Sequence, residues 1–178
     1  MATAEITGHS TMHEVLDAYP GAQRALMRGY HIGGCSSCGF APSDRLSDVL
    51  AGKNVRNVDE VIEFIKRSHE EEQRIQIGAQ ELAEALKGDT PPRLIDVREP
   101  DEQKIAHIDG FQPATKEFVQ EMMATWAKDT PIVTYCHHGL RSLEAASYFI
   151  GHGFTDVRSL TGGIEAWAEQ IEPSMARY

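Results

Sequence analysis

The stretch Pro131–Ser142 reads PIVTYCHHGLRS, and it decides which fold this chain is expected to adopt. Its first five residues form a short apolar run that contains β-branched side chains, which predicts a buried strand. Leu143–Ile150 follow with the spacing of a helix. A buried strand that passes directly into a helix is the repeating unit of parallel α/β proteins. Cys136 lies at the junction between these two elements.

The rest of the second half of the chain repeats this alternation of strand and helix. Ile75 and Ile77 begin it, and we expect an α/β fold with a parallel sheet flanked by helices. The other predicted strands are Leu94–Val97 and Asp156–Leu160, and the other predicted helices are Gln80–Lys87, Phe118–Ala127 and Ile164–Gln170.

The first half reads differently, because its apolar residues recur at helical spacing between short breaks. Helices are predicted at Met12–Tyr19, Ala22–Arg28 and Asp44–Ala51, and a further one begins after Asn57. Its charged end, Ser68–Arg74, is typical of a solvated helix end or a linker. The sequence therefore predicts a small all-α domain at 1–70 and an α/β domain at 71–178.

Charge and hydropathy exclude several classes of function. The 178 residues carry a formal net charge of −10, which argues against binding to nucleic acid or to anionic membrane surfaces. No apolar run approaches the roughly 20 residues of a membrane helix. Met1–Ser10 lacks the basic segment and the apolar core of a signal peptide, so a cytoplasmic location is expected.

Cys136 has the surroundings of a reactive thiol. A loop that leads into a helix directs backbone N–H groups towards its centre, where they stabilise a thiolate. Gly139 allows a tight or left-handed turn, and Arg141 can bind an anionic donor through two parallel hydrogen bonds. His137 and His138 add further donors. Neighbouring residues rarely converge on one ion, so neither a metal nor a cofactor is expected at this site.

The loop from Cys136 to Ser142 resembles the active-site loop of the rhodanese family, and three further segments agree with it. Leu94–Glu102 (LIDVREPDE), Ala106–Gly110 (AHIDG) and Gly162–Trp167 (GGIEAW) resemble other signatures of the family. The departures are Ala106, where glycine is usual, and Asp109–Phe111, where Pro-Gly-Ala is common. The resemblance covers the chain from about Ile75 onward, and it implies a rhodanese-type parallel sheet.

This resemblance implies a thiosulfate sulfurtransferase that carries sulfur as a persulfide on Cys136. The implied donor is thiosulfate or another sulfane-sulfur compound, and the implied acceptor is a thiol or cyanide. His137, His138, Gly139, Leu140, Arg141 and Ser142 would bind the substrate. Asp96 and Arg98 would form a structural ion pair near the end of a strand, with a direct role in substrate binding as the alternative.

Two other functions remain open for the same fold. One is a non-catalytic sulfur-sensing or binding module, although the loop around its cysteine is intact here. The other is a phosphatase or arsenate reductase. Four residues separate Cys136 from Arg141, whereas the related phosphatases have five, and the shorter loop favours sulfur transfer.

Cys35 and Cys38 form a C-x-x-C motif in a glycine-flanked loop of the helical half. Residues from about Ile6 to Arg67 resemble a small helical domain of the hybrid-cluster-associated disulfide type. Three interpretations of the pair stay open: a redox dithiol that relays sulfur from Cys136, two ligands of a metal or cluster completed by His31 or a second subunit, or a structural or idle pair. Oligomeric state cannot be predicted from these features.

Overall fold

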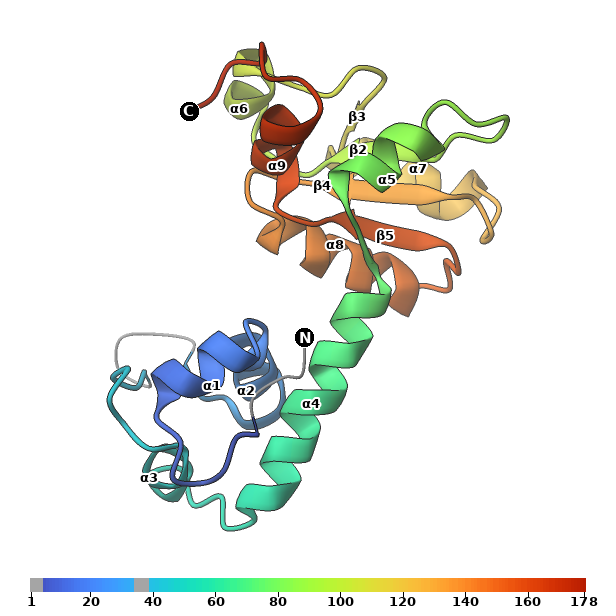
Figure 1. Cartoon of the computed structure of the whole chain (residues 1–178). Coiled ribbons are helices and arrows are strands. Elements are labelled where there is room, and N and C mark those ends of the chain that lie inside the picture. Colours follow the sequence, from blue (N-terminus) through green and yellow to red (C-terminus); the bar gives the residue numbers. More distant parts are fainter. Residues whose placement is uncertain (1–4, 34–38) are drawn as a thin grey trace. The chain divides into compact units, whose positions relative to one another are not determined.

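The computed structural model describes residues 5–33 and 39–178, and it divides the chain into two compact units (Figure 1). The units are Met1–Gln73 and Arg74–Tyr178. Helix α4 (Val58–Arg74) continues through the charged run, so the boundary expected at 70/71 falls inside a helix. A regular helix at this point means that the charged run is not an extended linker.

The first unit consists of helices around its own apolar core. Besides α4 it contains α1 (Met12–Ala18), α2 (Ala22–Tyr30) and α3 (Leu46–Ala51). Helix α1 begins at a capping box, in which Thr11 and Glu14 satisfy each other's backbone N–H groups. The core is formed by apolar side chains from all four helices, among them Met12, Val15, Leu26, Leu46, Leu50, Val61 and Ile65.

One local prediction in this unit was wrong, and a tertiary contact explains it. The helix expected from Asp44 begins at Leu46, because the carbonyl of Asp44 accepts a hydrogen bond from Met12 N at 2.8 Å. The charged run is the mostly exposed end of α4, as expected, although Glu72 within it pairs with Arg24 of α2 at 2.7 Å and its side chain is only 14% exposed. The last turns of α4 therefore pack against α2.

The second unit contains a five-stranded sheet in the order β1-β5-β4-β2-β3, and all neighbouring strands are parallel. The predicted α/β class with a parallel sheet is therefore confirmed. Strand β4 lies at the centre of the sheet, between β5 and β2, so the residue that follows it emerges in the middle of one edge. The strands are β1 (Gln76–Ile77), β2 (Arg93–Asp96), β3 (Gln112–Pro113), β4 (Ile132–Tyr135) and β5 (Val157–Leu160).

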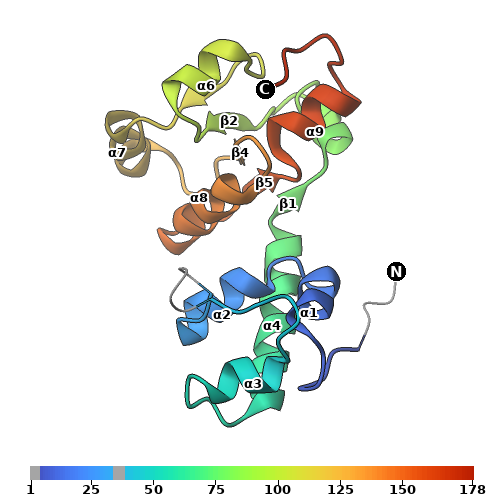
Figure 2. The ribbon, with the colours of Figure 1, turned by 90° about the vertical axis from the view of Figure 1, so that its left-hand side faces the viewer.

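Helices cover both faces of this sheet (Figures 1 and 2). Helices α5 (Ala79–Ala85) and α9 (Gly163–Gln170) pack on one face, where Leu94 and Val133 point. Helices α7 (Lys116–Thr125) and α8 (Leu140–Gly151) pack on the other face. Ile95 of β2 and Ile132 of β4 point to this second face. Successive strand side chains alternate between faces, so a sheet buried on both sides requires the continuous apolar runs seen in the sequence.

Two elements of this unit were not foreseen. Helix α6 (Pro100–Ile105) begins at a capping box formed by Glu99 and Glu102, with Pro100 in its first turn. Strand β3 has only two residues, which is too short for any periodic pattern to indicate. Pro100 and the two glutamates, Glu99 and Glu102, are a sequence pattern that predicts the start of a helix. The helix was missed because none of its residues is buried, so it shows no apolar periodicity.

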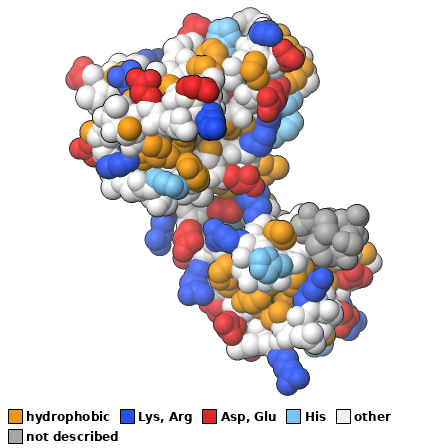
Figure 3. Space-filling view, turned by 180° about the vertical axis from the view of Figure 1, so that it is seen from behind, with side chains coloured by type: hydrophobic (Ala, Val, Ile, Leu, Met, Phe, Trp, Pro, Cys, Tyr) orange, Lys and Arg blue, Asp and Glu red, His pale blue; other side chains and the backbone are white. Residues whose placement is uncertain are grey.

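Acidic and basic side chains are interspersed over the drawn face of each unit (Figure 3). Among residues 5–33 and 39–178, no helix combines the length and the apolar composition needed to cross a bilayer.

Candidate active site

Cys136 directly follows central strand β4 and lies before helix α8, at the carboxyl end of the parallel sheet. Ligands of parallel α/β sheets bind at this edge. Gly139 is the N-cap of α8 and has φ = +89°, which agrees with the tight conformation expected of it. The side chain of Cys136 is a free thiol, and the residue is 1% exposed.

The sulfur of Cys136 accepts two hydrogen bonds from its own loop and helix. The N–H of Gly139 lies 3.2 Å from Sγ, and the hydroxyl of Ser142 lies 3.5 Å from it. Ser159 of β5 donates to the Ser142 hydroxyl at 2.8 Å, which leaves the Ser142 proton available for the sulfur. A thiolate or the terminal sulfur of a persulfide would be stabilised by the same donors.

The first residues of α9 hold the backbone of the loop that follows Cys136. Ile164 N donates to the carbonyl of Cys136 at 2.8 Å, and Glu165 N donates to the carbonyl of His137 at 3.2 Å. Gly163 has φ = +63°, and a Cβ there would lie 2.3 Å from the His137 carbonyl oxygen. Only glycine permits this close approach. The helix therefore holds two loop carbonyls through its first amides.

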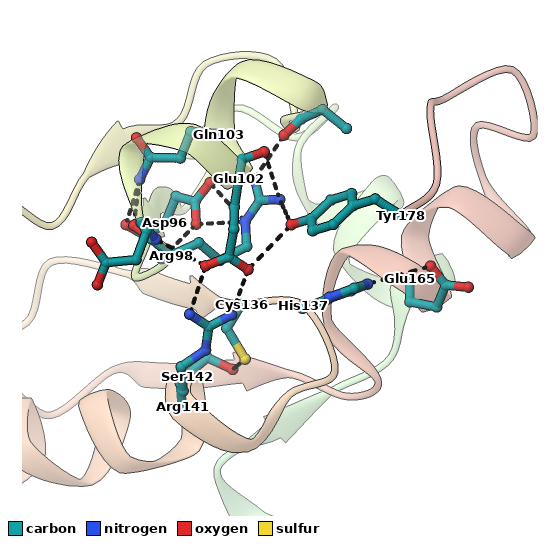
Figure 4. A network of polar contacts seen from close by, with 12 residues as sticks. Asp96, Arg98, Glu102, Gln103, Cys136, His137, Arg141, Ser142, Glu165 and Tyr178 are labelled. Carbon is teal, nitrogen blue, oxygen red and sulfur yellow. Dashed lines mark hydrogen bonds and ion pairs between the residues drawn. The ribbon is translucent and has the colours of Figure 1, made fainter.

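Arg141 does not project freely into the site (Figure 4). Both of its terminal nitrogens donate to the carboxylate of Glu102, each at 2.7 Å. Hydrogen bonding to Arg141 is the main reason that the pKa of Glu102 is lowered to about 2. The same hydrogen bonds are the main reason that the pKa of Arg141 is raised, and the charge of Cys136 adds to the effect. The fork expected to bind an anionic donor is thus occupied by Glu102.

Asp96 and Arg98 form the ion pair suggested by the sequence, with both side chains fully buried and 2.6 Å between Nη2 and Oδ2. Arg98 also donates to the carbonyl of Ala106 at 2.8 Å and to the hydroxyl of Tyr178 at 2.6 Å. Burial is the largest single influence and lowers the pKa of Arg98, but the hydrogen bonds and charge of Asp96 together with those of Tyr178 outweigh it, so the pKa is raised. The pair therefore connects the end of β2 to α6 and to Tyr178.

His137 is held in an aromatic stack rather than aimed at the sulfur. Its ring stacks on His138 at 3.9 Å between centroids and on Tyr178 at 4.4 Å. Burial, followed by the charge of His138, lowers the pKa of His137 from its ordinary value. Its Nε2 lies 3.8 Å from a carboxylate oxygen of Glu165. His138 is exposed, and so is Leu140 at 58%.

Of the predicted loop residues, the structure places Cys136, His137, Arg141 and Ser142 close to Asp96 and Arg98 (Figure 4). Gly139 joins them through its hydrogen bond to the sulfur, whereas the side chains of His138 and Leu140 are exposed. Glu102, Ser159 and Tyr178 were missed, since their partners lie 39, 17 and 80 residues away in sequence and no local pattern connects them. Cys35 and Cys38 fall outside the described residues. Within the described ranges, no group of three or more metal-ligating side chains occurs.

Comparison with known protein families gives a match within the second unit. The model of the rhodanese-like domain matches residues 78–170. Among curated proteins, the probable adenylyltransferase/sulfurtransferase MoeZ of Mycobacterium tuberculosis is 40% identical over 123 residues, which cover 60% of this chain and 31% of that protein. The thiosulfate sulfurtransferase GlpE of Pseudomonas aeruginosa is 40% identical over 75 residues, which cover 42% of this chain and 68% of GlpE. The chain thus spans about a third of MoeZ.

Two solved structures show the extent of the structural likeness. A rhodanese-related protein from Thermoplasma volcanium matches with a TM-score of 0.47 and 28% identity, over 55% of this chain and 94% of that one. The human single-domain sulfurtransferase TSTD1 matches with a TM-score of 0.47 and 22% identity, over 54% and 96% of the two chains.

Proposed function

Because the chain belongs to the rhodanese-like domain family, we propose that it is a sulfurtransferase that carries sulfane sulfur as a persulfide on Cys136. The observation that carries this proposal is the position of the Cys136 sulfur, at the sheet's carboxyl edge and hydrogen-bonded to Gly139 N and Ser142 Oγ. The curated relatives named above are sulfurtransferases, which supports the same reaction class.

In the first step, the Cys136 thiolate attacks the outer sulfur of a sulfane-sulfur donor such as thiosulfate. A new S–S bond forms to Cys136, the S–S bond of thiosulfate breaks, and its electron pair leaves with sulfite. The Gly139 amide and the Ser142 hydroxyl then stabilise the persulfide anion. No proton has to move in this step, since the attacking thiolate and the product persulfide carry the same charge.

In the second step, a nucleophilic acceptor takes the terminal sulfur. Cyanide attacks that sulfur, a carbon–sulfur bond forms to give thiocyanate, and the electron pair of the broken S–S bond returns to Cys136. A cellular thiol would accept sulfur in the same way. The reaction is thus a ping-pong displacement with one covalent intermediate.

The residues around Cys136 divide into two roles under this proposal. Gly139 and Ser142 contact the reacting sulfur, whereas His137, His138, Leu140 and Arg141 surround its approach and contribute to substrate binding. Asp96 and Arg98 support the loop through a buried network. Cys35 and Cys38 are proposed as a redox or sulfur-relay pair in the first unit.

Peptide mass spectrometry tests the carrier directly. The reduced protein is incubated with thiosulfate, and one added sulfur is expected on the peptide that contains Cys136, with none on that peptide in Cys136→Ser. Sulfur that also reaches Cys35 or Cys38, and is lost there in Cys136→Ser, would support the relay. If Cys136→Ser transferred sulfur to cyanide as fast as the unmodified chain, the proposed carrier would be wrong.

A further inference from the structure

Three arginines that the structure describes near the sulfur site, Arg98, Arg141 and Arg177, each pair with carboxylates. Arg98 pairs with Asp96, and Arg141 pairs with Glu102. Arg177, in the segment after α9, pairs with both Glu165 and Glu169. With three arginines against four carboxylates, these groups contribute a net charge of about −1. A dianionic ligand therefore meets no surplus of positive charge.

The position of the Glu102 carboxylate is fixed by other groups besides Arg141. One carboxylate oxygen accepts a hydrogen bond from the N–H of Glu99 at 3.0 Å, in the capping box of α6. The other accepts one from the hydroxyl of Tyr178 at 3.3 Å. The carboxylate is thus preorganised to receive both terminal nitrogens of Arg141, and the side chain is only 21% exposed.

Resting on the proposed function, we propose that Glu102 determines donor specificity. It occupies the two guanidinium nitrogens through which Arg141 would bind a dianion, and so favours organic persulfides over thiosulfate. A thiosulfate ion has to displace a carboxylate held by three groups, or else lie beside it and be repelled. A persulfide of an uncharged organic group carries at most one negative charge, so it depends less on Arg141 than a dianion does. Its organic part would lie against the stacked rings of His137 and Tyr178.

The reaction with such a donor balances without any further reagent. The Cys136 thiolate attacks the terminal sulfur of R–S–SH, and a new S–S bond forms to Cys136. The S–S bond of the donor breaks, and its electron pair leaves on R–S⁻. The terminal sulfur keeps its proton during the transfer, so a neutral Cys136 persulfide and a thiolate are formed. The persulfide then releases this proton to water, which gives the same Cys136 persulfide anion as the reaction with thiosulfate.

Alkylation of Cys136 measures the effect of Glu102 without any sulfur transfer. Iodoacetate and iodoacetamide have nearly the same size but differ by one negative charge, so the ratio of their rates reports the charge at the site. Glu102→Gln keeps the shape of the side chain and removes its charge. This variant should raise the iodoacetate/iodoacetamide ratio about three- to tenfold. Glu81→Gln, which removes a carboxylate paired with Arg158 in the same unit, should leave the ratio unchanged.

Sulfur loading of Cys136 then tests the choice of donor. In single-turnover experiments on the full chain, Glu102→Gln should lower the half-saturating concentration of thiosulfate about three- to tenfold, while loading from the persulfide of an uncharged thiol stays unchanged. An unchanged alkylation ratio, or equal changes for both donors, would overturn the role of Glu102. Absence of loading from either donor would instead refute the proposed function, and the alkylation ratio would still decide whether Glu102 controls the charge at Cys136.

Discussion

At the scale of single residues, the site depends on buried polar groups whose hydrogen bonds are satisfied within the fold. Ser142 is fully buried and connects two elements, because it accepts from Ser159 and donates towards the sulfur of Cys136. A buried hydroxyl without a partner would cost stability, so its fixed direction follows from the packing around it. This preorientation is what makes the hydroxyl useful to a charged sulfur.

Ser142→Ala should therefore slow the loading of Cys136 with sulfur. The loss of one hydrogen bond to the reacting sulfur is worth about 1 kcal/mol, or about fivefold in rate. Single-turnover loading followed by mass spectrometry measures this effect. The matched control is Ser147→Ala on the same helix, whose hydroxyl donates only to the carbonyl of Leu143. Equal losses in the two variants would argue that helix α8 was perturbed, not the sulfur.

Glu102 should also leave a signature in the dependence of stability on acid. Its pKa is about 2 in the folded chain against an ordinary value of 4.5, so the ionised form stabilises the fold. This contribution is complete above pH 4.5 and is lost as the pH falls towards 2. The free energy of unfolding of Glu102→Gln should therefore lie about 1 kcal/mol below that of the unmodified chain at neutral pH.

The difference between the two proteins should shrink towards zero between pH 4.5 and pH 2. Urea unfolding at a series of pH values measures it. A constant difference over this range would contradict the assignment of the stabilising charge to Glu102.

At the scale of elements, the ends of two helices meet at one loop. Helix α8 contributes the Gly139 amide to the sulfur, and α9 contributes the amides of Ile164 and Glu165 to two loop carbonyls. The α9 turn can approach this closely only because Gly163 lacks a side chain. The conformation of the loop is thus set by a contact between two helices that follow different strands.

Gly163→Ala should disrupt this contact. A Cβ at this position would lie 2.4 Å from the Cys136 carbonyl oxygen, and its φ of +63° is already unfavourable for alanine. We expect a loss of about 3 kcal/mol or more in the free energy of unfolding, together with slower loading of Cys136. Gly153→Ala is the matched control, since Gly153 has φ = +93° but nothing within 4 Å of its Cβ position.

The control should lose only about 1 kcal/mol, the cost of the backbone conformation alone. Urea unfolding of both variants measures the two costs. If both variants lost the same amount of stability, the close approach of the α9 turn would not be the cause.

At the scale of the whole molecule, each unit has an apolar core of its own. The core of the first unit is built from residues up to Ile65, and the two clusters on the sheet are built from residues from Ile75 onward. No buried apolar cluster of the described chain mixes residues from both units. A unit with its own core satisfies the main physical requirement for folding independently.

A fragment of residues 74–178 should therefore unfold in one cooperative transition and should load sulfur on Cys136 as the full chain does. Circular dichroism during urea unfolding measures the first property, and mass spectrometry measures the second. A fragment that showed no cooperative transition would indicate that the sheet depends on the first unit. Slower removal of sulfur by a thiol in the fragment, with equal loading, would implicate the first unit and its two cysteines in the second step.

The sequence alone determined the class of the fold, and it pointed to Cys136 as the proposed sulfur carrier. Both depend on local patterns, since the apolar run before Cys136, the glycine at 139 and the helix that follows are consecutive in the chain. The pairing of Arg141 with Glu102, the stacking of Tyr178 on His137 and the late start of α3 were decided only by the tertiary structure. These features join residues far apart in sequence, and their geometry depends on how strands and helices pack. The physical reason is that periodicity and turn preferences act over a few neighbouring residues, whereas ion pairs and aromatic stacks depend on distances that exist only after folding.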